Sequence, residues 1–192
     1  MEAPVSLLVV FLVFPVGFLL FLIISLSLKK RQASALFFKG ITYIKLLRSL
    51  LTRIQQHRGL TTGFINGNHA AQQNIATLSV QINQIIAELD AAGDWMKDNV
   101  KWSSLVDHWS RLSSIYIQGD ADKNFKQHNM LIANLLYLID DIADAHHLSK
   151  LTGEASDTDW RYLLSIAEYI GQARALGTGV AAKGEYSSVL RI

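Results

Sequence analysis

Apolar side chains recur at gaps of three and four residues along most of the chain, which is the spacing of one face of an α-helix. The pattern predicts amphipathic helices over residues 32–66, 69–92, 100–118, 121–151 and 158–183. No strand-like alternation of useful length interrupts them. We therefore expect an all-α protein, built as an up-and-down antiparallel bundle of four to five helices.

Each expected helix has one apolar stripe that should face the core of the bundle. In chain order the five stripes are Phe37, Ile41, Ile44, Leu47, Leu51 and Ile54; Ala71, Ile75, Leu78, Ile82, Ile85 and Leu89; Trp102, Leu105, Trp109, Leu112 and Tyr116; Phe125, His128, Ile132, Leu135, Ile139, Ile142 and His146; and Leu163, Ile166, Ile170, Ala173, Gly177 and Val180.

Turn residues divide these stripes. Gly67 and Gly93 are placed to end helices in a left-handed conformation, which glycine adopts without a steric penalty. Asn68 and Asp120 stand where the next helices should begin, and both residue types favour the N-cap. Residues 94–99 are expected to form a short turn.

A different pattern precedes the bundle. Residues 5–28 contain no charged side chain and are long enough to cross a bilayer as a helix, which needs about 20 apolar residues. The run lacks the basic start and the cleavage site of a secretory signal peptide. We therefore expect a transmembrane helix over residues 5–28, followed by a helical domain over residues 32–192.

The distribution of charge adds a direction to this expectation. The formal net charge is only +2, but no acidic residue occurs between Ala3 and Ala87, where all the charged side chains are Lys or Arg. Lys29, Lys30 and Arg31 directly follow the apolar run, and the positive-inside rule places such residues in the cytoplasm. The domain should then face the cytoplasm. Nucleic-acid binding is not expected, because the basic run lacks a recognition motif.

Composition and motifs exclude several kinds of chemistry. The chain has no cysteine, which removes disulfides and thiolate sites. It contains no nucleophile elbow, phosphate-binding glycine loop or His-Glu-x-x-His motif, so we expect neither an enzyme nor a cofactor. His146 and His147 are adjacent and point about 100° apart on a helix, so they do not share a metal easily. His128 and His146 lie on an apolar stripe and are expected to be hydrogen-bonded core histidines.

Arg58 is the informative polar residue. It lies four residues after Ile54 and seven after Leu51, and so continues the apolar stripe into the bundle. A buried guanidinium needs an anionic partner, and no acidic residue is near in sequence. The neighbouring hydroxyls of Thr61 and Thr62 could add donors to a bound ligand.

Arg174 has similar surroundings, four residues after Ile170 and among small residues. Two arginines and several hydroxyls would suit a small planar anion, because the guanidinium fork matches that geometry. The alternative is that each Arg forms an ion pair with a distant acid or faces solvent. The candidate acids are Asp140, Asp141, Asp144 and Glu168.

Two segments also carry a family resemblance. Residues 54–64, IQQHRGLTTGF, resemble the first motif of the nitrate- and nitrite-sensing domain, and residues 170–179, IGQARALGTG, are similar to a second element of that family. The resemblance implies an all-helical sensor domain of the bacterial inner membrane. It also implies that Arg58 and Arg174 bind nitrate or nitrite. Family members usually carry an output module that is not found here, so we expect a truncated or standalone copy.

Two functions therefore stay open. In the first, an anion bound between helices changes their packing and signals to an unidentified partner; a homodimer could complete the site. In the second, the bundle is a structural or scaffolding membrane protein that binds a protein partner, and Arg58 forms an internal salt bridge. A carboxylate in contact with Arg58 would favour the second function, whereas an empty polar pocket would favour the first.

Overall fold

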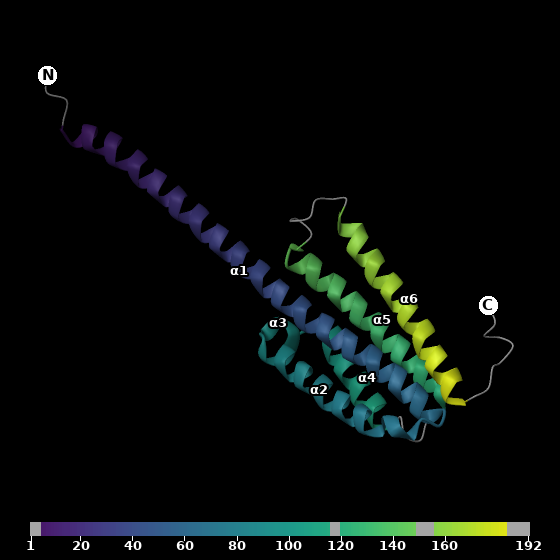
Figure 1. Cartoon of the computed structure of the whole chain (residues 1–192). Coiled ribbons are helices and arrows are strands. Elements are labelled where there is room, and N and C mark those ends of the chain that lie inside the picture. Colours follow the sequence, from purple (N-terminus) through teal and green to yellow (C-terminus); the bar gives the residue numbers. More distant parts are fainter. Residues whose placement is uncertain (1–4, 116–119, 149–155, 184–192) are drawn as a thin grey trace. The chain divides into compact units, whose positions relative to one another are not determined.

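The computed structural model describes residues 5–115, 120–148 and 156–183. These ranges contain six α-helices, one short 3-10 helix and no strand, so the predicted all-α class is confirmed for the described chain (Figure 1). The elements are α1 (Val5–Ile65), η1 (His69–Ala71), α2 (Gln72–Ala91), α3 (Asp94–Lys97), α4 (Val100–Ile115), α5 (Ala121–Ala145) and α6 (Ser156–Lys183).

The chain divides into two compact units, Met1–Lys39 and Gly40–Ile192. In the second unit the long helices run alternately in opposite directions along the chain, as expected for an up-and-down bundle (Figure 1). Its helices follow the expected ones closely. The expected turn over residues 94–99 contains the short helix α3, and the expected helix ends at residues 118 and 151 lie outside the described residues.

The first unit contains the N-terminal part of α1, a helix of 61 residues. No helix in the described part of the chain is long and apolar enough to span a membrane. The expected transmembrane helix over residues 5–28 is therefore not supported. The expected cytoplasmic orientation depended on that span and loses its basis.

Four helices supply nearly the whole core of the second unit. The predicted stripes of the second, third and fourth helices are largely confirmed, and Trp102 and Trp109 are each only 2% exposed. The buried apolar side chains that form this cluster are Tyr43, Leu47, Leu50, Leu51 and Ile54 from α1; Ile82, Ile86 and Leu89 from α2; Met96 from α3; Trp102, Leu105, Trp109 and Leu112 from α4; and Leu131, Ile132, Leu135, Leu138, Ile139 and Ile142 from α5.

The last helix packs by a different face from the one predicted. Leu163, Ile166 and Ile170, expected in the core, are exposed on α6, as are Ala173 and Gly177. The described residues of α6 that are buried are instead Glu168, Ala175 and Gly179. The prediction for this stripe was wrong because a polar contact and small residues, rather than apolar burial, decide which face of α6 packs on the bundle.

The turn chemistry explains how the helices are joined. Gly67 and Gly93 have φ values of 112° and 148°, in the region that only glycine enters freely. Asp120 caps α5, because its side chain accepts a hydrogen bond from the Asp122 amide. Asn68 occupies the N-cap position of η1 as predicted, but its side chain makes no capping hydrogen bond there.

Candidate functional site

Arg58 is completely buried on α1, and three helices provide its surroundings. Its Nη1 donates to Glu168 Oε1 on α6 and to Asn129 Oδ1 on α5, at 2.7 Å for the latter. Its Nη2 donates to Glu168 Oε2 at 3.4 Å. The ring of Phe125 lies 5.6 Å from the guanidinium carbon. The guanidinium therefore holds a carboxylate in a two-armed ion pair, the arrangement that best matches the Arg fork.

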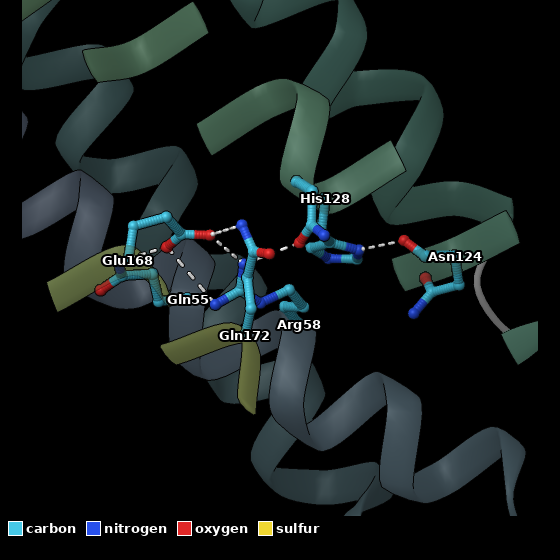
Figure 2. A network of polar contacts seen from close by, with 7 residues as sticks. Gln55, Arg58, Asn124, His128, Glu168 and Gln172 are labelled. Carbon is cyan, nitrogen blue, oxygen red and sulfur yellow. Dashed lines mark hydrogen bonds and ion pairs between the residues drawn. The ribbon is translucent and has the colours of Figure 1, made fainter. Parts of the chain in front are cut away.

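Glu168 is as fully engaged as Arg58. It is 6% exposed, and two glutamines complete the donor set around its carboxylate. Gln55 Nε2 donates to Oε2 at 2.8 Å, and Gln172 Nε2 donates to Oε1 at 3.0 Å. Figure 2 shows Glu168 between Gln55, Gln172 and Arg58, with α1 and α6 facing each other across the group. We call Gln55, Arg58 and Gln172 the anion cradle.

Two buried donor atoms at the cradle have no hydrogen-bond partner among the residues that the structure describes. They are Arg58 Nε and Thr62 Oγ1, which lie four residues apart on α1 and so on one face of the helix. An unsatisfied buried polar atom costs free energy, and such atoms are uncommon in folded proteins. An acceptor bound at the Arg58 end of α1 would supply the hydrogen bonds that these donors lack.

The other expected site residues divide into two groups. Thr61 is buried, but its hydroxyl donates to the His57 carbonyl at 2.8 Å and accepts from Asn124 Nδ2 at 3.0 Å, so it holds α5 against α1. Arg174 is exposed, and its carbonyl accepts a hydrogen bond from Thr178. The structure thus brings Arg58, Thr61 and Thr62 together, whereas it leaves the Arg174 side chain at the surface.

A chain of buried polar groups continues from Arg58 into the bundle. His57 and His128 are both completely buried, and His57 Nδ1 lies 2.9 Å from His128 Nε2. His128 Nδ1 donates to the Asn124 carbonyl at 2.9 Å, and Ser79 Oγ lies 3.2 Å from His57 Nε2. Because a carbonyl only accepts, His128 carries its proton on Nδ1 and accepts from His57 at Nε2.

Burial keeps both histidines neutral. Desolvation, followed by the charge of His128, lowers the pKa of His57 to about 3. Desolvation also lowers the pKa of His128 to about 4, against an opposing hydrogen bond to the Asn124 carbonyl and with a further lowering from Arg58 and His108. His57 also meets Trp109 edge-on, with ring centroids 4.9 Å apart. His57 and His128 thus form a hydrogen-bonded pair in the core, as expected for His128. His146 is also a hydrogen-bonded core histidine, as expected, because its ring bonds to the Ile142 carbonyl.

Sequence reasoning missed several members of this network. It named Glu168 among four candidate acids but did not identify His57, Gln55, Asn129 or Gln172. A usable signal exists for α6, because Glu168 and Gln172 are four residues apart and so share a helix face. No comparable signal exists for Asn129, whose position gains meaning only when α5 lies beside Arg58.

Gly171 fixes how closely α6 approaches the cradle. A Cβ atom at Gly171 would lie 2.9 Å from Arg58 Nη2 and 3.7 Å from Glu168 Oε2. Gly63 of α1 is similarly close to Thr178, at 3.1 Å, whereas Gly59 meets nothing within 4 Å. Gly63 therefore permits a close helix approach, and Gly59 does not contribute to one.

We predict that Gly171→Ala and Gly177→Ala will have different effects on stability. Ala is favoured over Gly in a helix by about 1 kcal/mol, and Gly177 has open space around it, so Gly177→Ala should raise the free energy of unfolding by up to about that amount. At Gly171 the new methyl group must displace the buried guanidinium, and such overpacking costs about 1–3 kcal/mol. Urea unfolding of both variants measures the difference. Equal stabilisation by the two substitutions would contradict the close approach.

The described residues thus define an all-helical bundle with an arginine-centred anion cradle buried between two of its helices. Comparison with known families gives a match to the nitrate and nitrite sensing family over residues 49–191. The match covers most of the chain, and the protein belongs to this family. Searches of curated proteins and of solved structures find no match.

Proposed function

We propose that the bundle is a signal-sensing domain that binds nitrate or nitrite between its helices, with Arg58 as the main residue that binds the anion. The observation that carries the proposal is the cradle itself: a fully buried guanidinium and two amide groups that hold a planar oxyanion, the Glu168 carboxylate. Membership of a nitrate and nitrite sensing family supports the choice of anion. The proposal contains no catalytic step.

The other expected site residues, Thr61, Thr62 and Arg174, have different roles in this proposal. Thr62 adds a buried hydroxyl that has no hydrogen-bond partner within the described ranges and lies on the same face of α1 as Arg58. Thr61 holds Asn124, and so keeps α5 in place behind the ligand. Arg174 lies exposed on α6, where its positive charge would attract the anion rather than bind it in the interior.

We predict that nitrate and nitrite will stabilise the full-length chain and that chloride at the same concentration will not. A ligand present at about 100 times its Kd adds about 2.7 kcal/mol, which for a chain of this size raises the unfolding midpoint by roughly 5–10 °C. Chloride has the same charge but no flat pair of oxygens for the Arg fork. Thermal unfolding followed by circular dichroism measures the shift.

Two lysine variants serve as controls for this measurement. Arg58→Lys keeps the charge but removes the fork, so the response to nitrate should weaken strongly. Arg48→Lys makes the same change at an exposed position of the same helix and should leave the response intact. Absence of a midpoint shift at millimolar nitrate, or an equal shift with chloride, would refute the sensing function.

The same contact also favours the second function considered from the sequence, for which a carboxylate on Arg58 was the expected observation. Arg58 already has a carboxylate partner, as expected if the bundle is a scaffold that binds a protein partner and the ion pair only stabilises its fold. In that case nitrate, nitrite and chloride would all leave the unfolding midpoint unchanged, while substitutions at Arg58 would still destabilise the chain. The same thermal experiment therefore distinguishes the two functions.

A further inference from the structure

The Glu168 carboxylate has the shape and charge of the proposed ligand. A carboxylate presents two oxygens on one planar centre with a single negative charge, and nitrite does the same; nitrate adds a third oxygen in the plane. Each carboxylate oxygen of Glu168 accepts from the guanidinium and from one glutamine amide. Donors placed for this carboxylate are therefore also placed for a planar oxyanion.

The donors of the cradle serve only one anion at a time. Two negative groups held side by side in a buried site repel each other strongly, and Arg58 is buried deeply enough that it needs one of them. Occupation by Glu168 and occupation by a free anion are therefore mutually exclusive states of the same three side chains.

We propose that Glu168 is a built-in competing ligand: it fills the anion cradle when no nitrate or nitrite is bound, and the anion displaces it and releases α6. This inference rests on the proposed sensing function and specifies how the same site is regulated. A ligand can shift such an equilibrium only through its different affinity for the two states, and here the difference is the presence or absence of Glu168 on Arg58.

The packing of α6 explains why displacement would move this helix. Among the residues of α6 whose side chains are described (162–183), only Glu168, Ala175 and Gly179 are buried and Leu164 is partly buried against the core, whereas Tyr162 and Tyr169 are 67% and 70% exposed. By contrast, α5 has nine buried residues. Elements with few buried apolar contacts open most readily, so the ion pair to Arg58 is a major part of what holds α6 on the bundle.

The test replaces Glu168 in the full-length chain and measures the binding of free anions. Glu168→Ala should bind nitrate and nitrite at least about ten times more tightly than the unchanged chain, because no carboxylate has to be displaced. Formate, a free planar carboxylate, should also raise the unfolding midpoint of this variant, whereas equal chloride should not. Glu88→Ala, at an exposed position of α2, is the matched control and should bind as the unchanged chain does.

A second measurement does not depend on the folding of any variant. Hydrogen exchange of the unchanged chain should show faster amide exchange in α6 when nitrate is added, while α5 and α2 keep their protection. If the unchanged chain binds nitrate but α6 protection does not fall, or if Glu168→Ala gains no affinity, the competing-ligand role of Glu168 is wrong and the sensing function stands. If neither protein responds to nitrate or nitrite, the sensing function itself is wrong, and the competing role is overturned with it.

Discussion

Replacing Arg58 with alanine should destabilise the folded chain by about 3–5 kcal/mol, the usual cost of removing one member of a buried ion pair. The loss arises because Glu168 is 6% exposed and would be left in the interior with only Gln55 and Gln172 as donors. Asn129 would also lose the donor that lies 2.7 Å from its side-chain oxygen. Chemical unfolding at neutral pH measures the change.

Two further variants make the result specific to the pair. Arg48→Ala removes the same side chain from an exposed position of α1 and should change stability by no more than about 0.5 kcal/mol. The double variant Arg58→Met/Glu168→Met replaces both charges with apolar groups of similar length. It should be more stable than Arg58→Ala, because no unpaired charge stays buried. Comparable losses at Arg58 and Arg48 would show that the ion pair contributes little to stability.

Acidification below about pH 6.5 should destabilise the chain. His57 and His128 have pKa values lowered to about 3 and about 4 in the folded state, against about 6.5 in an unfolded chain. Between these values the unfolded state binds protons that the folded state excludes, so stability falls as the pH drops below about 6.5. From pH 7 to pH 5 the two histidines together should cost about 4 kcal/mol of unfolding free energy.

The sign of this effect follows from burial. Above pH 7 both states hold neutral histidines, and the pair contributes no pH dependence. Below pH 6 each histidine adds a slope of about 1.4 kcal/mol per pH unit, which continues until the folded state itself becomes protonated. Arg58 and His108 oppose protonation of His128 further, because both can present positive charge to it. Urea unfolding at half-unit steps of pH would give the slope directly.

Substitution of single histidines identifies the source of the slope. His128→Asn or His57→Gln should remove about half of the pH dependence between pH 5 and 6, whatever their effect on stability at pH 7. His147→Asn is the control, since His147 is exposed and has a φ of 55°, a conformation that Asn tolerates. An unchanged unfolding free energy between pH 7 and pH 5 would show that His57 and His128 are not buried as neutral groups.

The hydrophobic pattern determined most of the bundle. Leu78, Ile82 and Leu89 of α2, like Trp102 and Trp109 of α4, are buried as their spacing predicts, because an amphipathic helix can lower its free energy only by turning its apolar face inward. Gly67 and Gly93 also ended their helices as predicted, since a positive φ is a local property that requires no information about the rest of the fold.

The hydrophobic pattern did not predict which face of α6 is buried. Leu163, Ile166 and Ile170 form a regular apolar stripe in the sequence, yet they are exposed. Four other helices already close the core around Ile132 and Leu135, so little apolar surface was left for a fifth. The orientation of α6 was then decided by the need of Arg58 for a counter-ion and by the small side that Gly171 and Gly179 present to α1.

The sequence by itself predicted that Arg58 lies inside a helical bundle and that its partner is either a residue far along the chain or a bound anion. It could not choose among Asp140, Asp141, Asp144 and Glu168, because all four lie on helices and the choice depends on how those helices are rotated. Only the tertiary structure selected Glu168 and placed His57 against His128. The physical reason is that spacing along one helix defines which residues share a face, whereas the partner of a buried polar group is set by the packing of different helices.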